Sequence, residues 1–252
     1  MLPFNLPDLG ACFRRYFEIV PALTDELRDH AYRIRHEVYC EELKYEPERP
    51  DRREFDEYDA HSLHCLIRSL KRGNYVGCTR LVLARPGDPL HPLPFEKTCA
   101  HSIDRSILDP RALPRDTIAE VSRLAVISGY RLRRGEQDRP VGLTEESFGT
   151  RRLPRFPYIP VGLYLGTIEL AAAHGIDTLF VLTESRLAVH FARLGVAIKQ
   201  IGSAVQHRGA RVPSSMSVSG IIGGLNFLVR PLYKEIAKQV RQGLEMQKAP
   251  LL

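Results

Sequence analysis

Charged residues stand inside a short apolar segment of this sequence, where they are suited to acid–base chemistry. Residues 119–126 read Ala-Glu-Val-Ser-Arg-Leu-Ala-Val, and turn-rich segments bound them on both sides. This pattern predicts a buried strand that carries Glu120 and Arg123. A charge in such a strand is costly unless it is paired, hydrogen-bonded or used. We therefore interpret this strand as the floor of an active site.

Four more charged residues lie on or beside apolar segments. Arg80 stands within a predicted strand, and Arg35 borders the apolar stripe of a predicted helix, where periodicity alone favours a side chain that extends to solvent. Asp56 and Asp59 are three residues apart, so they could share one helical turn and hold an ammonium group, or form a solvated acidic turn. Buried ion pairs would also explain these residues. Their spread over a helix, a loop and two strands favours a shared cleft.

Hydrophobic periodicity and turn residues predict the elements that must position these side chains. Thr24 is the expected N-cap of the first helix, and Gly175 the expected end of a helix that is apolar on nearly all sides. The expected elements are a strand at 13–20, a helix from 25 to about 40, a long loop at 41–55, a hairpin of strands 63–70 and 75–84, a short helix near 94–101, the strand ending near 127, a polar loop at 129–157, the buried helix 161–174, a strand at 178–183, a helix at 185–194, a strand at 196–201 and a terminal helix at 231–247.

The order of these elements predicts an α/β layered fold in one domain that spans residues 1–252. We expect a core over about residues 13–210 and a C-terminal extension over 211–252 that ends in a helix. A chain of this length can bury one substantial core.

Composition narrows the possible partners. The net charge is +6 and arginine dominates the basic side, which suits an anionic partner. Nucleic acid is disfavoured because aromatic residues do not interleave with the arginines as a stacking platform requires.

The cysteines and histidines predict neither disulfides nor a metal site. The five cysteines show no metal-ligand spacing and the histidines are scattered, so we expect reduced thiols, no metal site and a cytoplasmic protein. We expect neither a signal peptide nor a transmembrane segment, and residues 218–229 offer at most peripheral membrane contact.

Four short motifs occur in an order that resembles the N-acyl-homoserine-lactone (autoinducer) synthases. In that family the signature runs R-x-x-V-F, D-x-Y-D, G-x-x-R-L and E-x-S-R-F. The matching segments here are Arg35 to Tyr39, Asp56 to Asp59, Gly77 to Leu81 and Glu120 to Leu124. The resemblance covers about residues 28–127 and implies a fold similar to the GNAT acetyltransferases. That fold has a mixed β-sheet, splayed at its middle and flanked by helices, so that a thioester arm can enter.

The sequence departs from the autoinducer synthases in two respects. It contains no tryptophan, whereas those enzymes carry tryptophans at the positions of Tyr45 and Ala119, and its second half differs. In these respects the chain is similar to the N-acyl amino acid synthases. It resembles most closely the acyltransferases associated with the exosortase (PEP-CTERM) protein-sorting system. The segments that carry this likeness are 32–42, 120–126, 162–165 and 201–202.

The resemblance implies an N-acyltransferase that moves a fatty acyl group to the α-amine of an amino acid. Glu120 would be the general base and Arg123 would orient Glu120 or the substrate carboxylate. Asp56 and Asp59 would shape the amine side, and Arg35 and Arg80 would hold a carboxylate or fix the lid by ion pairs. Alternatives are an autoinducer synthase that uses S-adenosylmethionine, and a non-catalytic protein that binds nucleic acid or acyl carrier protein.

The acyl donor would be the phosphopantetheine arm of acyl carrier protein, or acyl-coenzyme A, with no tightly bound cofactor. GNAT enzymes bind the coenzyme A pyrophosphate at a Gly-rich turn after the central strand, which residues 130–135 match only in part. We therefore expect acyl carrier protein, an acidic partner, as the donor. The arginines expected to dock it are Arg131, Arg133, Arg134, Arg151 and Arg152.

Overall fold

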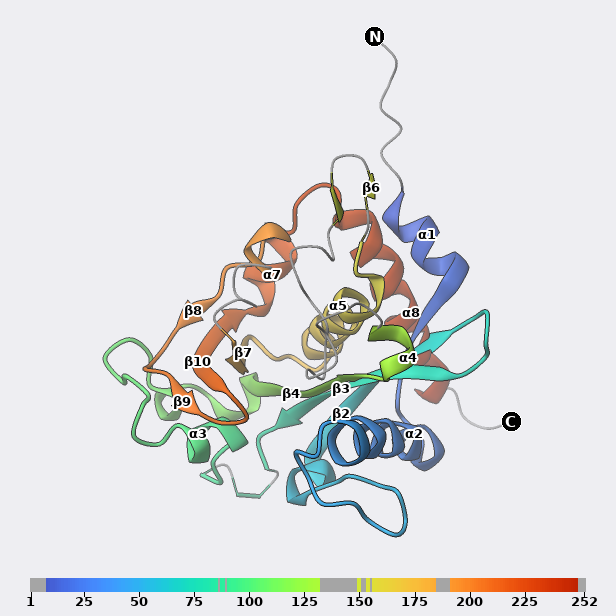
Figure 1. Cartoon of the computed structure of the whole chain (residues 1–252). Coiled ribbons are helices and arrows are strands. Elements are labelled where there is room, and N and C mark those ends of the chain that lie inside the picture. Colours follow the sequence, from blue (N-terminus) through green and yellow to red (C-terminus); the bar gives the residue numbers. More distant parts are fainter. Residues whose placement is uncertain are drawn as a thin grey trace.

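A computed structural model describes residues 8–85, 87–88, 90–131, 149–150, 153–154, 156–184 and 191–248. A mixed sheet runs through the molecule with the strand order β1-β2-β3-β4-β7-β10-β8, and β9 pairs with β10 (Figure 1). The strands are β1 (Phe17–Pro21), β2 (Ser62–Ser69), β3 (Tyr75–Leu83), β4 (Ile118–Val126), β7 (Thr178–Thr183), β8 (Lys199–Gln200), β9 (Val205–Gln206) and β10 (Ala210–Ser217). A separate small ladder joins β5 (Gly149–Thr150) to β6 (Leu153–Pro154).

Helices cover both faces of the sheet (Figure 1). One face carries α2 (Asp25–Arg35), which continues as a π-helix over His36–Glu42, a 3₁₀ helix (Glu57–His61) and the short α3 (Pro94–Thr98). The other face carries α1 (Leu9–Tyr16), α5 (Tyr158–Ala173), α7 (Val218–Gly224) and α8 (Arg230–Lys248). Two more 3₁₀ turns (Pro110–Ala112 and Arg115–Thr117) precede β4, and α4 (Ser128–Arg131) follows it.

Helix α5 lies at the centre of the main core. Leu163, Leu165 and Ile168 are fully buried, because the sheet covers one side of the helix while α7 and α8 cover others. This surround explains why the sequence of α5 is apolar on nearly all sides. The helix begins at Tyr158 after the N-cap Pro157, slightly earlier than expected, and Gly175 follows it with a positive φ of 71°.

The sheet opens between β4 and β7. These two strands are parallel, and they pair only at Ile118–Thr178, Ala119–Leu179 and Glu120–Phe180. Both strands continue beyond these pairs, β4 to Val126 and β7 to Thr183, without further register partners in each other. The sheet is therefore splayed from Glu120 onward, as expected for a GNAT-like fold.

Two expectations about the ends of the chain need correction. Residues 9–16 form helix α1, whose N-cap Asp8 accepts from the backbone N–H of Gly10, so the first strand starts only at Phe17. Residue 210 is not the edge of the core either. Strand β10 is part of the central sheet, and α8 buries Leu232, Ile236 and Val240 in the main core.

Replacing Gly166 by alanine is expected to destabilise the fold by about 1–3 kcal/mol, because helix α5 approaches the sheet closely at this residue. A Cβ there would lie 2.8 Å from Sγ of Cys65 and 2.9 Å from Cγ2 of Ile19. Gly223 in α7 is the matched control, since a Cβ would meet nothing within 4 Å. Urea unfolding should show a loss for Gly166→Ala and no loss for Gly223→Ala, and equal stability of the two variants would contradict the close packing.

Candidate active site

Glu120 lies on β4 at the last residue pair before the sheet opens. Its side chain lines a cavity of about 340 Å³ between the diverging halves of the sheet. Arg80 and Arg123 line the same cavity. Because Glu120 is only 4% exposed and yet lines this space, it faces a cleft and is shielded from bulk water.

The protein raises the proton affinity of Glu120. Burial raises the pKa of the Glu120 carboxyl to about 7, against the opposing effects of Arg80 and Arg123. The backbone N–H of Phe95, in the first turn of α3, donates to Oε2 at 2.7 Å and also opposes the rise. This hydrogen bond holds one carboxylate oxygen in place. A carboxyl with a pKa near neutrality is suited to take up and release a proton at physiological pH.

A β-bulge places Arg123. Opposite β3, Arg80 pairs with Ser122 and Cys78 pairs with Ala125, so two residues of β4 stand against the single residue Thr79. Arg123 lies in this bulge with a left-handed φ of 52°. In a regular strand Ser122 and Arg123 would point to opposite faces. Here Ser122 accepts a hydrogen bond from Arg80, and Arg123 contacts Glu54 and Asp56 on the same side of the sheet.

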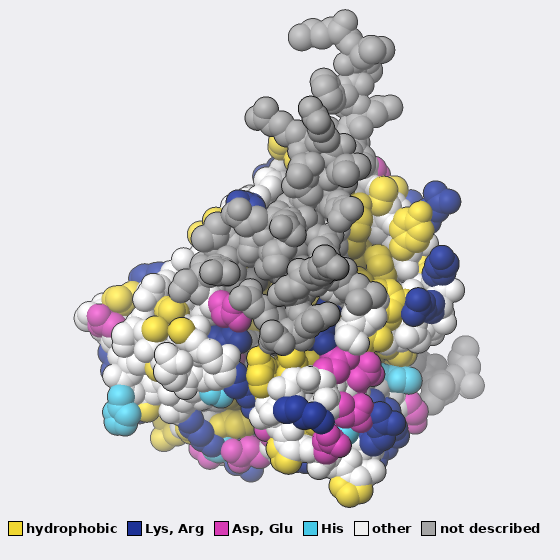
Figure 2. Space-filling model, viewed as in Figure 1, with side chains coloured by type: hydrophobic (Ala, Val, Ile, Leu, Met, Phe, Trp, Pro, Cys, Tyr) yellow, Lys and Arg dark blue, Asp and Glu magenta, His cyan; other side chains and the backbone are white. Residues whose placement is uncertain are grey.

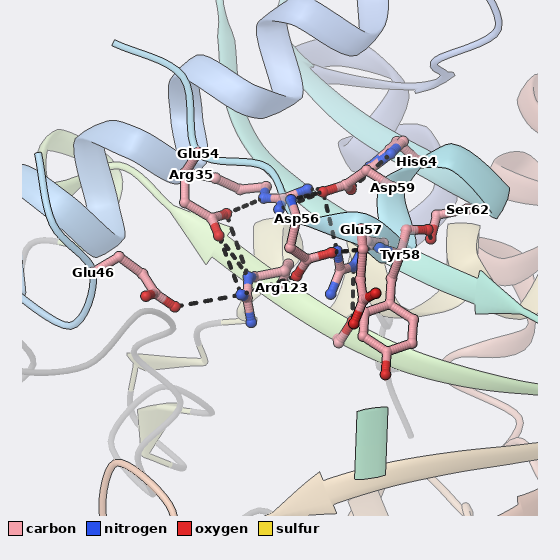
Figure 3. Close-up of polar contacts among 12 residues, drawn as sticks. Arg35, Glu46, Glu54, Asp56, Glu57, Tyr58, Asp59, Ser62, His64 and Arg123 are labelled. Atoms are coloured by element: carbon pink, nitrogen blue, oxygen red, sulfur yellow. Dashed lines mark hydrogen bonds and ion pairs between the residues drawn. The ribbon is translucent and has the colours of Figure 1, made fainter. Parts of the chain in front are cut away.

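Arg35 is a buried ion-pair partner and does not extend to solvent, so the expectation from periodicity was wrong. Its side chain is 0% exposed. It donates to Glu54 from Nε at 2.5 Å, and to both carboxylate oxygens of Asp59 at 2.6 and 3.0 Å (Figure 3). Helix α2 ends at Arg35, and the π-helix follows directly.

Asp56 and Asp59 form a capping box at the 3₁₀ helix Glu57–His61. Asp56 accepts from the backbone N–H of Tyr58 at 2.9 Å, and the backbone N–H of Asp56 donates to Asp59 at 2.7 Å. Arg80 binds both carboxylates, at 2.6 Å to Asp56 and 3.1 Å to Asp59. The buried Asp59 is thus engaged by protein groups, whereas Asp56, with a side chain 30% exposed, also lines the cavity.

Sequence reasoning missed two carboxylates of this network. Glu54 joins Arg35 to Arg123, and Glu46 lies 3.4 Å from Arg123 (Figure 3). Glu46 also forms an ion pair with Arg208. Burial alone would raise the pKa of the Glu54 carboxyl, but the charges of Arg35 and Arg123 outweigh it and hold the pKa at about 2. Both residues lie in the acidic loop 41–55, where many glutamates look alike in sequence and no periodicity marks the buried one.

A hydrogen bond to the π-helix and the buried ion-pair network hold the loop after α2 in place. His36, which is buried, accepts a hydrogen bond from the backbone N–H of Arg49 at 3.0 Å and so anchors the loop to the π-helix. Acidic and basic side chains lie close together on the lower part of the molecular surface (Figure 2). Arg52 of the loop forms an ion pair with Glu41, and both side chains are partly exposed. Such surface pairs contribute at most about 1 kcal/mol each, so the buried network sets the geometry.

The cavity has an apolar end and a cationic side. Tyr164 of α5, Met216 of β10 and Phe191 line the apolar end, and the hydroxyl of Tyr164 donates to Sδ of Met216 at 3.2 Å. On the cationic side lie Arg208 and Arg211, which come from the hairpin of β9 and β10. Neither hairpin arginine was singled out in the sequence, because residues 205–211 show no motif.

The arginines expected to dock a carrier protein are only partly covered by the structure. Arg131 is 6% exposed and forms an ion pair with Glu42, so its charge is not presented at the surface. Arg133, Arg134, Arg151 and Arg152 lie outside the described residues. In the described part of the chain, no helix has both the length and the apolar character needed to cross a membrane.

Residues 34–138 match the family model described as acetyltransferase (GNAT) domain. Over these residues the chain is similar to the GNAT acetyltransferases. The match begins at the last two residues of α2 and contains β2, β3 and β4, and hence Arg35, Arg80 and Glu120. This match and the mixed sheet confirm the predicted GNAT-like α/β fold and, at this general level, the prediction of an acyltransferase. No curated protein matches the chain in sequence.

Solved structures of the same fold include acyl-transferring synthases. The CoA-dependent acyl-homoserine lactone synthase BjaI, with SAM and isopentyl-CoA, has a TM-score of 0.55 at 18% identity, covering 91% of this chain and 99% of BjaI. For the AHL synthase LasI the TM-score is 0.54 at 17% identity, over 83% and 95% of the two chains. FeeM, an N-acyl amino acid synthase from uncultured soil microbes, gives 0.51 at 13% identity, over 83% and 94%. The chain therefore shares its fold with both classes that the sequence resembles.

Proposed function

We propose that this GNAT protein transfers a fatty acyl group from a thioester to the α-amine of an amino acid. The observation that carries the proposal is Glu120, a shielded carboxyl with a pKa of about 7 that faces the cavity at the opening of the sheet. The apolar end of the cavity suits an acyl chain, and its charged side suits a zwitterionic acceptor.

The proposed reaction needs a base and a held carbonyl. The amine nitrogen attacks the thioester carbonyl carbon, and Glu120 removes a proton from that nitrogen, directly or through water. The tetrahedral intermediate then breaks its C–S bond, and the thiolate that leaves takes up a proton, so that an amide and a free thiol are formed. Backbone groups of β4 beyond Glu120 have no register partner in β7, which leaves this edge for the thioester arm.

Acyl carrier protein is the donor that we favour. A carrier-bound arm brings one phosphate, whereas in coenzyme A that phosphate is part of a pyrophosphate. Residues 130–135 match the usual pyrophosphate turn only in part. The arginines of the loop 129–157 other than Arg131 would receive the acidic carrier protein. On the sequence resemblance, we also propose that the protein acts with the exosortase system.

An autoinducer synthase is the second candidate, because BjaI and LasI share the fold. S-adenosylmethionine also carries an α-amine beside a carboxylate, so it too would suit the charged side of the cavity. The products separate the two functions, since only the synthase releases an acyl-homoserine lactone.

Product analysis tests both candidates. The purified protein would be incubated with acyl carrier protein or coenzyme A thioesters of several chain lengths, with either the protein amino acids or S-adenosylmethionine. Mass spectrometry should detect N-acyl amino acids, and faster release from acyl carrier protein would support the favoured donor. A lactone formed only with S-adenosylmethionine would replace the proposal, and the absence of any acylated product would refute acyl transfer.

Met216→Ala is expected to shift the preferred acyl chain towards longer thioesters by about two to three carbons. Met216 and Tyr164 lie at the apolar end of the cavity, and truncation of a methionine removes about three heavy atoms from that wall. The relative kcat/KM for thioesters of graded length would be measured for wild type and variant. Met246, which is 80% exposed on α8, provides the control Met246→Ala, and it should keep the wild-type profile. An unchanged profile in Met216→Ala would remove Met216 from the acyl site.

A further inference from the structure

Two arginines on the β9–β10 hairpin lie at the open end of the sheet. Val212 of β10 pairs with Thr183, the last residue of β7, so the hairpin lies beside the end of β7 that has diverged from β4. The turn holds Arg208 at a left-handed φ of 53°, and Arg211 follows on β10. Both guanidinium groups reach the cavity that Glu120 lines.

The two hairpin arginines differ from Arg80 and Arg123 in how they are held. Arg80 and Arg123 each contact a buried carboxylate, Asp59 and Glu54 respectively. Arg211 has one ion-pair partner among the described residues, Glu184 at 3.0 Å, and its remaining hydrogen bond goes to the backbone oxygen of Arg208 at 3.3 Å. Glu184 has a side chain 30% exposed, so water or a ligand can reach this pair.

Arg208 shows a similar arrangement. It pairs with Glu46, whose side chain is 23% exposed, and its guanidinium lies 5.7 Å from the ring centre of Tyr45. Glu46 belongs to the loop after α2 and reaches across from there. The hairpin cations are therefore each met by a partly exposed carboxylate, which shows that a carboxylate fits at these positions. A guanidinium has five N–H donors, so one carboxylate does not use all of them.

The residues that line the cavity include more arginines than carboxyl groups, and Glu46, Glu54 and Asp59 outside the lining neutralise part of that charge. Four arginines line the cavity, together with the three carboxyl groups of Asp56, Glu120 and Glu184. The pKa of the Glu120 carboxyl is raised, so its negative charge is partly lost near neutral pH. His207, which also lines the cavity, has a pKa lowered first by burial and then by Arg208, Arg123 and Arg211, so it adds no charge of its own.

We propose that Arg211 and Arg208 bind the α-carboxylate of the acceptor, so that the site accepts amines that carry a free carboxylate on the neighbouring carbon. This inference rests on the proposed acyl transfer. In an α-amino acid the amine and the carboxylate share one carbon. A carboxylate held by the hairpin, on the opposite side of the opening from β4, leaves the amine directed towards Glu120. The acceptor carboxylate replaces or joins Glu184 and Glu46 on the two guanidinium groups.

The test uses two acceptor pools with a saturating acyl thioester: the protein amino acids, and their α-carboxamides, which keep the amine but lack the charge. Wild type should use the amino acids at least about ten-fold better in kcat/KM. Arg211→Gln should raise the amino-acid concentration for half-maximal rate by about 10–100-fold, the effect of losing a charged hydrogen bond. It should leave the rate with the carboxamides unchanged, and Arg208→Gln should act in the same direction.

Controls separate the possible failures. Arg105→Gln removes a surface arginine paired with Asp109 at 2.7 Å and should behave as wild type. Thermal unfolding would confirm that each variant folds. Equal use of the two pools by wild type, or an equal loss on both in Arg211→Gln, overturns the carboxylate site. A raised KM for the thioester instead assigns the arginines to the donor phosphate and also overturns it. If wild type acylates neither pool, the proposed function fails, and calorimetric titration of the amino-acid pool against wild type and Arg211→Gln still decides whether the arginines bind a carboxylate.

Discussion

Replacing Glu120 by glutamine is expected to lower kcat by about 10²–10⁴-fold, the usual contribution of a general base. Glutamine has nearly the same shape and its oxygen can still accept from the backbone N–H of Phe95, so the site should remain assembled. Initial rates with a saturating thioester and amino acid would measure the effect. Asp116→Asn, which changes an exposed carboxylate just before β4, is the matched control and should retain full activity.

The pH dependence of the rate is a second test of Glu120 as the general base. The base must be ionised, so kcat/KM of wild type should rise with pH up to about 7, and this limb should be missing in Glu120→Gln. The pKa of Glu120 in the folded protein, about 7, lies above the ordinary value of 4.5. The protonated carboxyl therefore stabilises the folded protein fully below about pH 4.5, and this stabilisation is lost as the pH rises through about 7. At about pH 8 the glutamine variant should therefore be at least as stable as wild type. Undiminished turnover in this variant would exclude Glu120 as the base.

Replacing Arg35 by methionine is expected to lower the free energy of unfolding by about 3–5 kcal/mol. The change leaves the buried carboxylates of Glu54 and Asp59 without their main partner. Carboxylates in that position either ionise without compensation or become protonated, and both are costly. Urea unfolding at neutral pH, followed by circular dichroism, would measure the loss.

Arg33 is the matched control for Arg35. It lies two residues earlier on α2 and forms an ion pair with Asp29 at 2.6 Å, but its side chain is 51% exposed. Arg33→Met should cost less than about 1 kcal/mol. A similar loss of unfolding free energy in both variants would mean that the buried network does not stabilise the fold. The role of Arg35 would then be in function alone.

The sequence predicted the strand with Glu120 and Arg123, the hairpin of β2 and β3, and the apolar helix α5, because each has a strong local pattern. It also indicated that six charged residues from distant segments meet, and the structure brings Arg35, Asp56, Asp59, Arg80 and Arg123 into one ion-pair network. Glu120 shares the cavity with Arg80 and Arg123 without an ion pair between them among the described contacts.

What the sequence could not predict depends on contacts between distant segments. Glu54 is one of several similar glutamates, and only its position under Arg35 makes it a buried partner. The aspartates suggested an ammonium site, but the capping box and Arg80 occupy Asp59. Arg35 seemed to lie at a solvent boundary, since periodicity describes one helix and not the loop that covers it. The hairpin arginines became visible only when β10 was placed next to β7.

The bulge in β4 makes the length of this strand as important as its side chains. With one extra residue, Ser122 and Arg123 reach the same side of the sheet, and Val126 joins the main core on the α5 side. Deleting a single residue between Glu120 and Val126 would make every later side chain of β4 point to the opposite face of the sheet. Arg123 would then face the apolar surface of α5, or Val126 would leave it. Side chains in β4 can be exchanged one at a time, but its residue count cannot change without loss of either the charged site or the core.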